Sequence, residues 1–247
     1  MDFIKGTIRS AFRACGYEVA RRDTSVGFHK DADIYRLLSA TPNPVIFDVG
    51  ANIGQSVEEF KKLFPSSVIH SFEPSPGAFA KLQETSRRFS GVHLNNVALG
   101  ASPATAQLQE NTSSDMSSFL PLDKDAWGRI EKQTTVQVAT LDDYCAGHDI
   151  PRVDLLKIDT QGYDLEVVKG ARRLMAEGRI NLVLIEIGFA KFYKGAPQLD
   201  EIYRFFIQNR FRLVSFYALK YIEGFVSECN GLFAPLPAGS AAQEKLP

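Results

Sequence analysis

The 247-residue chain lacks the features of a membrane-spanning or secreted protein. It has no run of 18 consecutive apolar residues, which a membrane-spanning helix needs. Its N-terminus has no continuous apolar segment of the kind found in signal peptides. Its three cysteines, Cys15, Cys145 and Cys229, are odd in number and are not spaced as metal ligands. We therefore expect a cytoplasmic protein with reduced, inert cysteines.

The chain also lacks an excess of charge of either sign. It contains 28 basic and 29 acidic residues, which gives a net charge of −1. This balance offers no electrostatic reason to expect a nucleic-acid partner. A hydrophobic fraction of 45% is ordinary for a folded domain, and the length suits one large α/β domain. We expect that domain at residues 41–237, after a helical extension at 1–40 and before a tail at 238–247 that is predicted to be disordered.

A glycine-containing turn follows the first apolar run, at residues 45–47, which predicts a parallel strand covered on both faces. The turn reads D-x-G-x-N-x-G and lacks the third glycine of a dinucleotide-binding fingerprint. Glycines let the backbone turn sharply and approach a ligand at this edge of a sheet. A pyrophosphate is disfavoured beside Asp48, whereas the ammonium and sulfonium of S-adenosylmethionine (SAM) are attracted to a carboxylate. Asp48 and Asn52 therefore favour SAM over NAD.

A second acidic residue, Glu73, ends the next apolar run and is followed by Pro74. It lies 25 residues after Asp48. An acid near this offset commonly accepts hydrogen bonds from ribose hydroxyls. Because SAM and NAD both carry such a ribose, Glu73 supports an adenosine ligand without distinguishing them.

Two more acids end predicted parallel strands, Asp159 after residues 153–158 and Glu186 in residues 181–187. Such strand ends share one crevice, although an acid there can also cap a helix. SAM donates a methyl group, and its transfer to a hydroxyl, if a hydroxyl is the acceptor, needs in-line positioning and a base for the hydroxyl proton. Asp159 is the first candidate at the reacting centre, as base or as a residue that orients SAM. Glu186 is the second, as base or as a ligand of acceptor hydroxyls. No compact carboxylate cluster predicts a metal.

Five segments, taken together and in order, resemble the FkbM-type SAM-dependent methyltransferases. They are Asp48-Val49-Gly50-Ala51-Asn52-Ile53-Gly54, Phe72-Glu73-Pro74, Asn96-Val97-Ala98-Leu99-Gly100, Thr140-Leu141-Asp142-Asp143 and Lys157-Ile158-Asp159-Thr160-Gln161-Gly162-Tyr163-Asp164. The resemblance spans residues 45–186. It implies a Rossmann-like class I methyltransferase fold, with a mostly parallel sheet, an antiparallel C-terminal strand and helices on both faces. It also implies O-methylation of a hydroxyl of a sugar, glycan or natural product.

The residues expected to bind SAM are Asp48, Gly50, Asn52, Gly54, Gln55, Glu73, Pro74, Asn96, Val97, Ala98 and Asp159. By analogy with the family, residues 96–98 hold the adenine, although Asn96 can equally cap a turn. Gln161 departs from the glutamate often found at this place in the family, so an acidic role is not carried over to it. Two alternatives stay open: an NAD-dependent oxidoreductase on a related sheet, and an inactive SAM-fold module that binds a partner or glycan.

The acceptor pocket is expected to involve residues 1–39 and 111–133. Residues 1–16 have the pattern of a basic amphipathic helix, which can dock on the domain, cover an anionic acceptor or make peripheral contact with a membrane. Residues 104–109 and 134–138 alternate as in an inserted hairpin, joined by a hydroxyl-rich loop. Such a loop suits a polar acceptor or serves as a flexible connector.

Overall fold

A computed structural model describes residues 14–15, 27 and 29–236 of the chain. The predicted basic helix and the predicted C-terminal tail lie outside these residues, apart from residues 14–15, and both stay predictions, as do the predicted domain boundaries. In the part of the chain that is described, no helix combines the length and apolar character needed to cross a bilayer.

The centre of the fold is a seven-stranded sheet in the order β3-β2-β1-β7-β8-β10-β9. Its strands are β1 Val45–Val49, β2 Val68–Phe72, β3 Val92–Asn95, β7 Leu155–Ile158, β8 Val183–Gly188, β9 Phe211–Ile222 and β10 Phe225–Pro235. The first five strands of that order are parallel, whereas β10 is antiparallel to both β8 and β9. The predicted fold class is confirmed. The strand order reverses between β1 and β7, which is where ligands bind in open α/β sheets.

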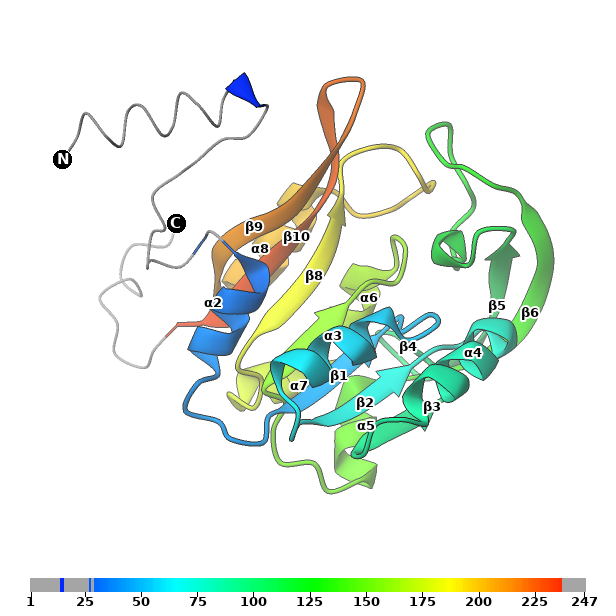
Figure 1. The fold of residues 1–247 in the computed structure, drawn as a ribbon. Coiled ribbons are helices and arrows are strands. Elements are labelled where there is room, and N and C mark those ends of the chain that lie inside the picture. Colours follow the sequence, from blue (N-terminus) through cyan, green and yellow to red (C-terminus); the bar gives the residue numbers. More distant parts are fainter. Residues whose placement is uncertain (1–13, 16–26, 28, 237–247) are drawn as a thin grey trace.

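Helices cover both faces of the sheet because neighbouring strand residues point to opposite sides. Ile46 belongs to a core cluster with α2 (Lys30–Leu37), α3 (Gln55–Leu63) and α4 (Pro76–Ser86). Phe47 belongs to the cluster on the other face, with α5 (Leu141–Gly147), α6 (Asp164–Lys169), α7 (Arg172–Ala176) and α8 (Leu199–Gln208). Figure 1 shows α2 and α3 on the near side of the sheet.

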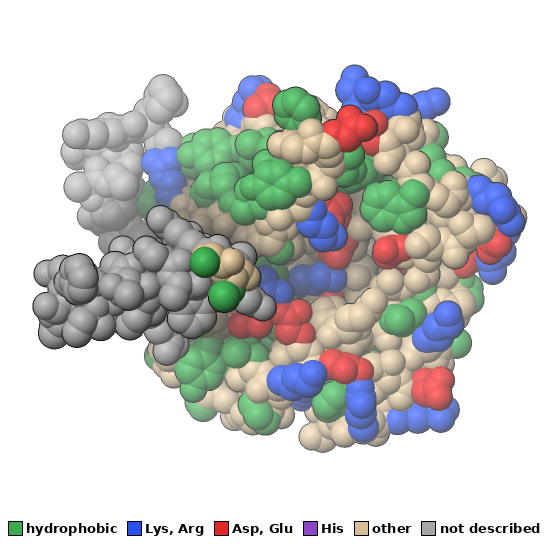
Figure 2. Space-filling model, turned by 45° about the horizontal axis from the view of Figure 1, so that its top comes forward, with side chains coloured by type: hydrophobic (Ala, Val, Ile, Leu, Met, Phe, Trp, Pro, Cys, Tyr) green, Lys and Arg blue, Asp and Glu red, His purple; other side chains and the backbone are tan. Residues whose placement is uncertain are grey.

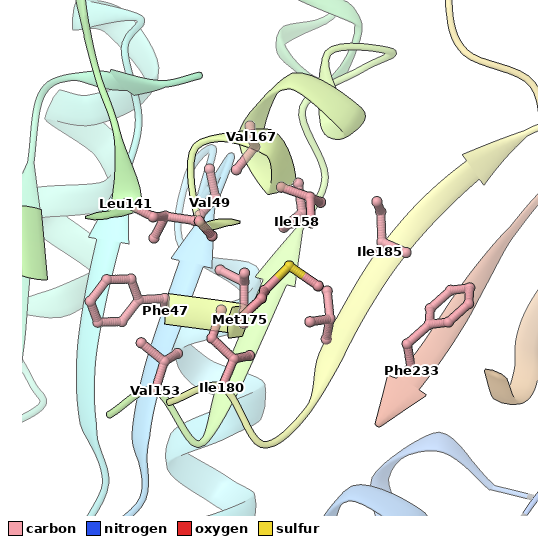
Figure 3. Packing of buried hydrophobic residues seen from close by; sticks show 14 of the residues in the cluster. Phe47, Val49, Leu141, Val153, Ile158, Val167, Met175, Ile180, Ile185 and Phe233 are labelled. Carbon is pink, nitrogen blue, oxygen red and sulfur yellow. The ribbon is translucent and has the colours of Figure 1, made fainter. Parts of the chain in front are cut away.

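The core cluster that contains Phe47 explains why the central strands are continuous apolar runs in the sequence. Phe47, Ile158 and Ile185 come from three adjacent strands and are at most 1% exposed (Figure 3). Burial of each such side chain stabilises the fold by about 1.5–3 kcal/mol. The parallel strands thus hold their carboxyl ends, and the loops that follow, in fixed positions.

The apolar pattern of the sequence predicts one strand at residues 92–99 and one helix around residues 165–175, and the structure differs from both predictions. The single strand expected at residues 92–99 is divided into β3 and β4 (Ala98–Leu99), and β4 belongs to a second sheet of order β4-β6-β5. The chain turns between them because Asn96 Nδ2 donates to the carbonyls of Glu73 at 2.8 Å and Pro74 at 3.1 Å. The helix expected around residues 165–175 is interrupted at Gly170, where a Cβ would lie 2.1 Å from the carbonyl oxygen of Gly100.

The inserted hairpin is present as β5 (Ala104–Asn111) and β6 (Ile130–Ala139), which pair antiparallel. The hydroxyl-rich loop between them contains the 3-10 helix η1 (Ser114–Met116). Ser118 of this loop donates from its Oγ to the carbonyl of Gln161 at 2.6 Å. This hydrogen bond holds the insertion against the loop that follows β7, beside the switch point.

Candidate active site

A first cavity opens at the carboxyl ends of β1, β2 and β7. Figure 2 shows that one face of the molecule is hollowed near its middle, with charged side chains around the hollow. The lining residues are Val49, Gly50, Asn52, Phe72, Glu73, Pro74, Val97, Ala98, Leu99, Leu108, Ser114, Asp115, Ser117, Ser118, Phe119, Asp159, Thr160, Gln161 and Tyr163. Their only charged members are acids. The cavity therefore favours a cationic guest over a pyrophosphate.

Asp48 does not line this cavity, although the sequence predicts direct contact with a cationic donor. It is fully buried, and its Oδ2 accepts a hydrogen bond from Ser56 Oγ at 2.6 Å. Its Oδ1 lies 3.1 Å from Nζ of Lys157, which also donates to the carbonyl of Gly50 at 3.0 Å. Burial opposes the charge on Lys157, but Asp48 and then Asp159 raise its pKa. The charge of Asp48 is thus balanced inside the protein.

Lys157 is a site residue that the sequence analysis missed. Its side chain is 13% exposed and points from β7 toward two carboxylates, Asp48 at 3.1 Å and Asp159 at 3.8 Å. A lysine inside an otherwise apolar strand was the available signal, because a buried ammonium needs a carboxylate partner.

Glu73 lies at the end of β2 and lines the first cavity. Its Oε2 accepts a hydrogen bond from the N–H of Asn52 at 2.9 Å, and its Oε1 accepts one from the N–H of Ser75 at 2.8 Å. Each oxygen retains one acceptor position. Burial raises the pKa of Glu73 to about 7, although these N–H groups oppose the rise. Glu73 therefore exchanges its proton near neutral pH.

The two glycines of the turn are required by the protein's own packing. Gly50 has φ +73°, and a Cβ there would lie 1.9 Å from the carbonyl oxygen of Asp159. Gly54 has φ +97°, and its Cβ would lie 2.9 Å from Cγ2 of Thr85. Gly50 thus allows the loops after β1 and β7 to meet, and Gly54 allows the start of α3 to pack against α4.

The predicted SAM-binding residues divide into two groups. Those that line the first cavity are Gly50, Asn52, Glu73, Pro74, Val97, Ala98 and Asp159. Those that do not are Asp48, Gly54, Gln55 and Asn96. Gln55 is the exposed first residue of α3, and Asn96 holds the loop after β2 by the hydrogen bonds described above. Asp48, Gly54 and Asn96 hold the chain around the first cavity without lining it.

Asp159 and Glu186 are joined by the side chain of Gln161. Its Nε2 donates to Asp159 Oδ1 at 2.8 Å and to Glu186 Oε2 at 3.0 Å, and its Oε1 accepts a hydrogen bond from the hydroxyl of Tyr193 at 2.9 Å. Burial, and next the charge of Asp159, raise the pKa of Glu186 well above its usual value. The structure thus brings both predicted catalytic acids together, through two residues with no predicted role in the site.

A second cavity also has Gln161 in its lining. Its lining residues are Asp123, Gln161, Gly162, Asp164, Glu186, Gly188, Ala190, Lys191, Phe192, Tyr193, Gly195, Ala196, Pro197, Gln198, Ile202 and Glu228. Most of them follow β8, in a segment that the sequence analysis did not link to a pocket. Of the expected acceptor region at 111–133, the residues that line the first cavity are Ser114, Asp115, Ser117, Ser118 and Phe119, and Asp123 lines the second.

The residues of the first cavity fit SAM. Asn52 Oδ1 and Thr160 Oγ1 are buried atoms of lining residues and have no hydrogen-bond partner among the residues that the structure describes. Buried polar atoms are normally paired, so these two atoms indicate a ligand with polar groups. Val97, Ala98 and Leu99 offer an apolar surface for an adenine. Among the described residues, no group of three or more His, Cys, Asp or Glu side chains is arranged to hold a metal ion.

Residues 48–213 match the family model described as "Methyltransferase FkbM domain". The chain is 26% identical over 172 residues to "2-O-methyltransferase NoeI" of Sinorhizobium fredii, a match that covers 65% of this chain and 70% of the relative. It is also 26% identical over 161 residues to "Hexuronic acid methyltransferase AglP" of Haloferax volcanii, covering 64% of this chain and 62% of the relative.

One solved structure with a similar fold is a magnesium protoporphyrin IX methyltransferase of Synechocystis PCC 6803 with bound SAM. The TM-score is 0.48 at 10% identity, over 94% of this chain and 97% of that chain. The family model covers two thirds of the present sequence, from Asp48 in β1 to the start of β9. The chain therefore belongs to the family of FkbM methyltransferase domains, which are SAM-dependent methyltransferases.

Proposed function

We propose that this chain transfers the methyl group of SAM to a hydroxyl oxygen of a sugar, glycan or natural product. The observation that carries the proposal is the first cavity, whose charged lining is acidic and which contains two unpartnered polar atoms. The names of the two relatives, a 2-O-methyltransferase and a hexuronic acid methyltransferase, support a sugar hydroxyl as the acceptor. The NAD alternative is disfavoured because the described part of the lining has no basic residue for a pyrophosphate.

In this proposal, Glu73 accepts the ribose hydroxyls, and Asn52 and Asp159 bind the cationic methionine part of SAM. Val97 and Ala98 contact the adenine. When bound, SAM supplies a methyl group made electrophilic by its sulfonium. The buried pair of Asp48 and Lys157 fixes the loop that carries Gly50, because Lys157 holds the Gly50 carbonyl at 3.0 Å.

The acceptor hydroxyl has to lose its proton, and we assign that proton to a carboxylate oxygen of Glu186. A carboxylate whose pKa lies nearer the working pH is a stronger general base than an ordinary one. Asp159 faces the first cavity, whereas Glu186 faces the second. Gln161 holds the two carboxylates at 2.8 and 3.0 Å from its Nε2, and the Tyr193 hydroxyl fixes which way its amide points.

Calorimetric titration with SAM and with NAD, followed by transfer of labelled methyl groups to free sugar hydroxyls, tests the proposal. We expect SAM to bind in the micromolar range, NAD not to bind, and label to appear in the acceptor. Absence of SAM binding would contradict the proposal. SAM binding without transfer to any sugar would favour the inactive binding module instead.

The affinity for SAM is expected to fall as the pH is lowered below about 7. Ionised Glu73 accepts hydroxyl hydrogen bonds most strongly, and burial raises the pKa of this group to about 7. Binding therefore favours loss of the proton, and the Kd rises by up to about tenfold per pH unit below that pKa. Calorimetry between about pH 8 and about pH 5.5 measures the slope.

The Glu73→Gln variant separates this titration from others in the same range. It keeps the side chain's size and removes its charge, so we expect weaker binding at high pH and a flatter pH dependence. Asp164, with a pKa raised by burial to about 6, and His70, with a pKa lowered by burial to about 4, are unchanged in both proteins. Equal slopes for the two proteins would remove Glu73 from this role.

A further inference from the structure

The second cavity adjoins the first through one shared side chain, that of Gln161. It lies at the carboxyl end of β8, where Glu186 and Gly188 form part of its wall. A molecule bound there meets Glu186 directly, whereas Asn52 and Glu73 line the first cavity. A two-substrate transfer needs two adjoining sites with the reacting groups at their boundary.

The wall of this cavity is tied together by backbone hydrogen bonds. The N–H of Asp123 donates to the carbonyl of Phe192 at 2.8 Å, and the N–H of Asp125 donates to that of Lys191 at 3.1 Å. Leu122 and Tyr193 form an antiparallel bridge between the same two segments. The inserted loop thus holds the segment after β8 in a defined position, as expected of a preformed binding site.

We infer that the second cavity receives the methyl acceptor, and that it prefers a polyhydroxyl compound without carboxylate, phosphate or sulfate groups to an anionic one. This inference rests on the proposed function, because it assigns the second substrate of that reaction. It differs from the acceptor named for the Haloferax relative, which is a hexuronic acid.

The preference for an acceptor without anionic groups follows from the charges that line the second cavity. Four lining residues are acids, Asp123, Asp164, Glu186 and Glu228, and one is basic, Lys191. Glu228 is paired with Lys220. If that pair is counted as neutral and Glu186 is left out because it takes up the acceptor's proton, the carboxylates of Asp123 and Asp164 still face one ammonium, that of Lys191. Burial raises the pKa of Asp164 only to about 6, so Asp164 remains largely ionised at neutral pH. An anionic acceptor would meet net repulsion there.

The remaining lining suits a polyhydroxyl compound. Carboxylates accept hydrogen bonds from hydroxyl or ammonium donors, as do the amide oxygens of glutamines such as Gln198. Phe192 and Tyr193 offer apolar ring surface beside these acceptors. Trp127 lies next to Phe192, with ring centroids 5.4 Å apart, and is 44% exposed. Polar acceptors beside aromatic rings can bind both the hydroxyls and the C–H faces of a sugar ring.

The test uses the full chain loaded with S-adenosylhomocysteine and three methyl pyranosides that share hydroxyls at C3 and C4. These probes are a neutral glucoside, a glucosaminide and a glucuronide. Binding is measured by saturation-transfer NMR, and methyl transfer is measured separately with labelled SAM. We expect the glucoside and the glucosaminide to bind at least about tenfold more tightly than the glucuronide, with a difference that shrinks as salt is added.

The Asp123→Lys variant reverses one charge of the wall, and the Asp123→Asn variant removes it with less disturbance. Both are expected to bind the glucuronide better, so that the preference falls at least about threefold in the lysine variant. Glu131→Lys is the matched control, because Glu131 is exposed on β6 and lines neither cavity. It makes the same change in net charge and should leave the preference unaltered.

The possible outcomes distinguish the inferred preference, the assignment of the second cavity to the acceptor and the proposed function. Tighter binding of the glucuronide, or an equal effect of Glu131→Lys and Asp123→Lys, would overturn the inferred preference. Normal SAM binding with no binding of any of the three glycosides would overturn the assignment of this cavity and leave the donor site intact. Loss of SAM binding would count against the proposed function itself.

Discussion

Replacement of Glu186 by glutamine is expected to lower kcat by about 10²–10⁴-fold while the Kd of SAM changes little. Glutamine keeps the size of the side chain, and its carbonyl oxygen can still accept the hydrogen bond from Gln161. It cannot accept the proton of the acceptor hydroxyl. Glu186 does not line the first cavity, so the affinity for SAM should be preserved. Steady-state methyl transfer and calorimetry with SAM measure the two quantities.

Two comparisons make this result specific. Glu166→Gln removes an acid of α6 that pairs with Lys169 at 2.6 Å, and it should leave kcat unchanged. Asp159→Asn alters a residue of the first cavity, so its main effect should be weaker SAM binding. A kcat for Glu186→Gln within about threefold of the wild-type value would exclude Glu186 as the base.

Replacement of Lys157 by methionine is expected to lower the free energy of unfolding by about 3–5 kcal/mol, the range found when one partner of a buried ion pair is removed. Asp48 is 0% exposed and would lose its positively charged partner at 3.1 Å. Methionine fills a similar volume, so the loss reports the uncompensated charge rather than a cavity. Urea denaturation of the protein without SAM measures it.

A more exposed ion pair, that of Lys169 and Glu166, provides a control for the Lys157→Met variant. Lys169→Met removes the partner of Glu166 in a pair whose side chains are 33% and 37% exposed, and it should cost less than about 1 kcal/mol. The double variant Lys157→Met, Asp48→Asn should recover part of the stability, because the unpaired charge is removed. Equal losses for Lys157→Met and Lys169→Met would show that the buried pair does not stabilise the fold.

The central sheet could be predicted because its strands are buried on both faces, and such strands appear in the sequence as continuous apolar runs. The strands predicted at residues 45–47, 153–158 and 181–187 correspond to β1, β7 and β8, which are parallel strands of the sheet. The turn at Gly50 and Gly54 was recognisable because a positive φ strongly favours glycine. The start of α5 also follows a local rule, because a threonine is a preferred N-cap residue and Thr140 accepts the N–H of Asp143 at 3.0 Å.

What escaped the sequence analysis depends on partners distant along the chain. Nothing local to Asp48 indicates that a lysine 109 residues later neutralises it. The division of residues 92–99 between two sheets follows from hydrogen bonds of Asn96 to the chain after β2. Tyr193 lies 32 residues after Gln161 in the sequence and donates a hydrogen bond to Gln161 Oε1. This contact turns the Nε2 group of Gln161 toward Asp159 and Glu186.

The sequence by itself determined which segments form the central strands, which acids stand at the ends of these strands and to which family the chain belongs. Only the tertiary structure decided which acids face a cavity and which are paired inside the protein. The physical reason is that periodicity and turn residues report how deeply a position is buried, whereas an electrostatic partner is selected by distance in space. In the sequence, Asp48 and Glu73 are both acids at the end of a predicted strand. In the folded protein, Asp48 pairs with Lys157, whereas Glu73 lines the first cavity.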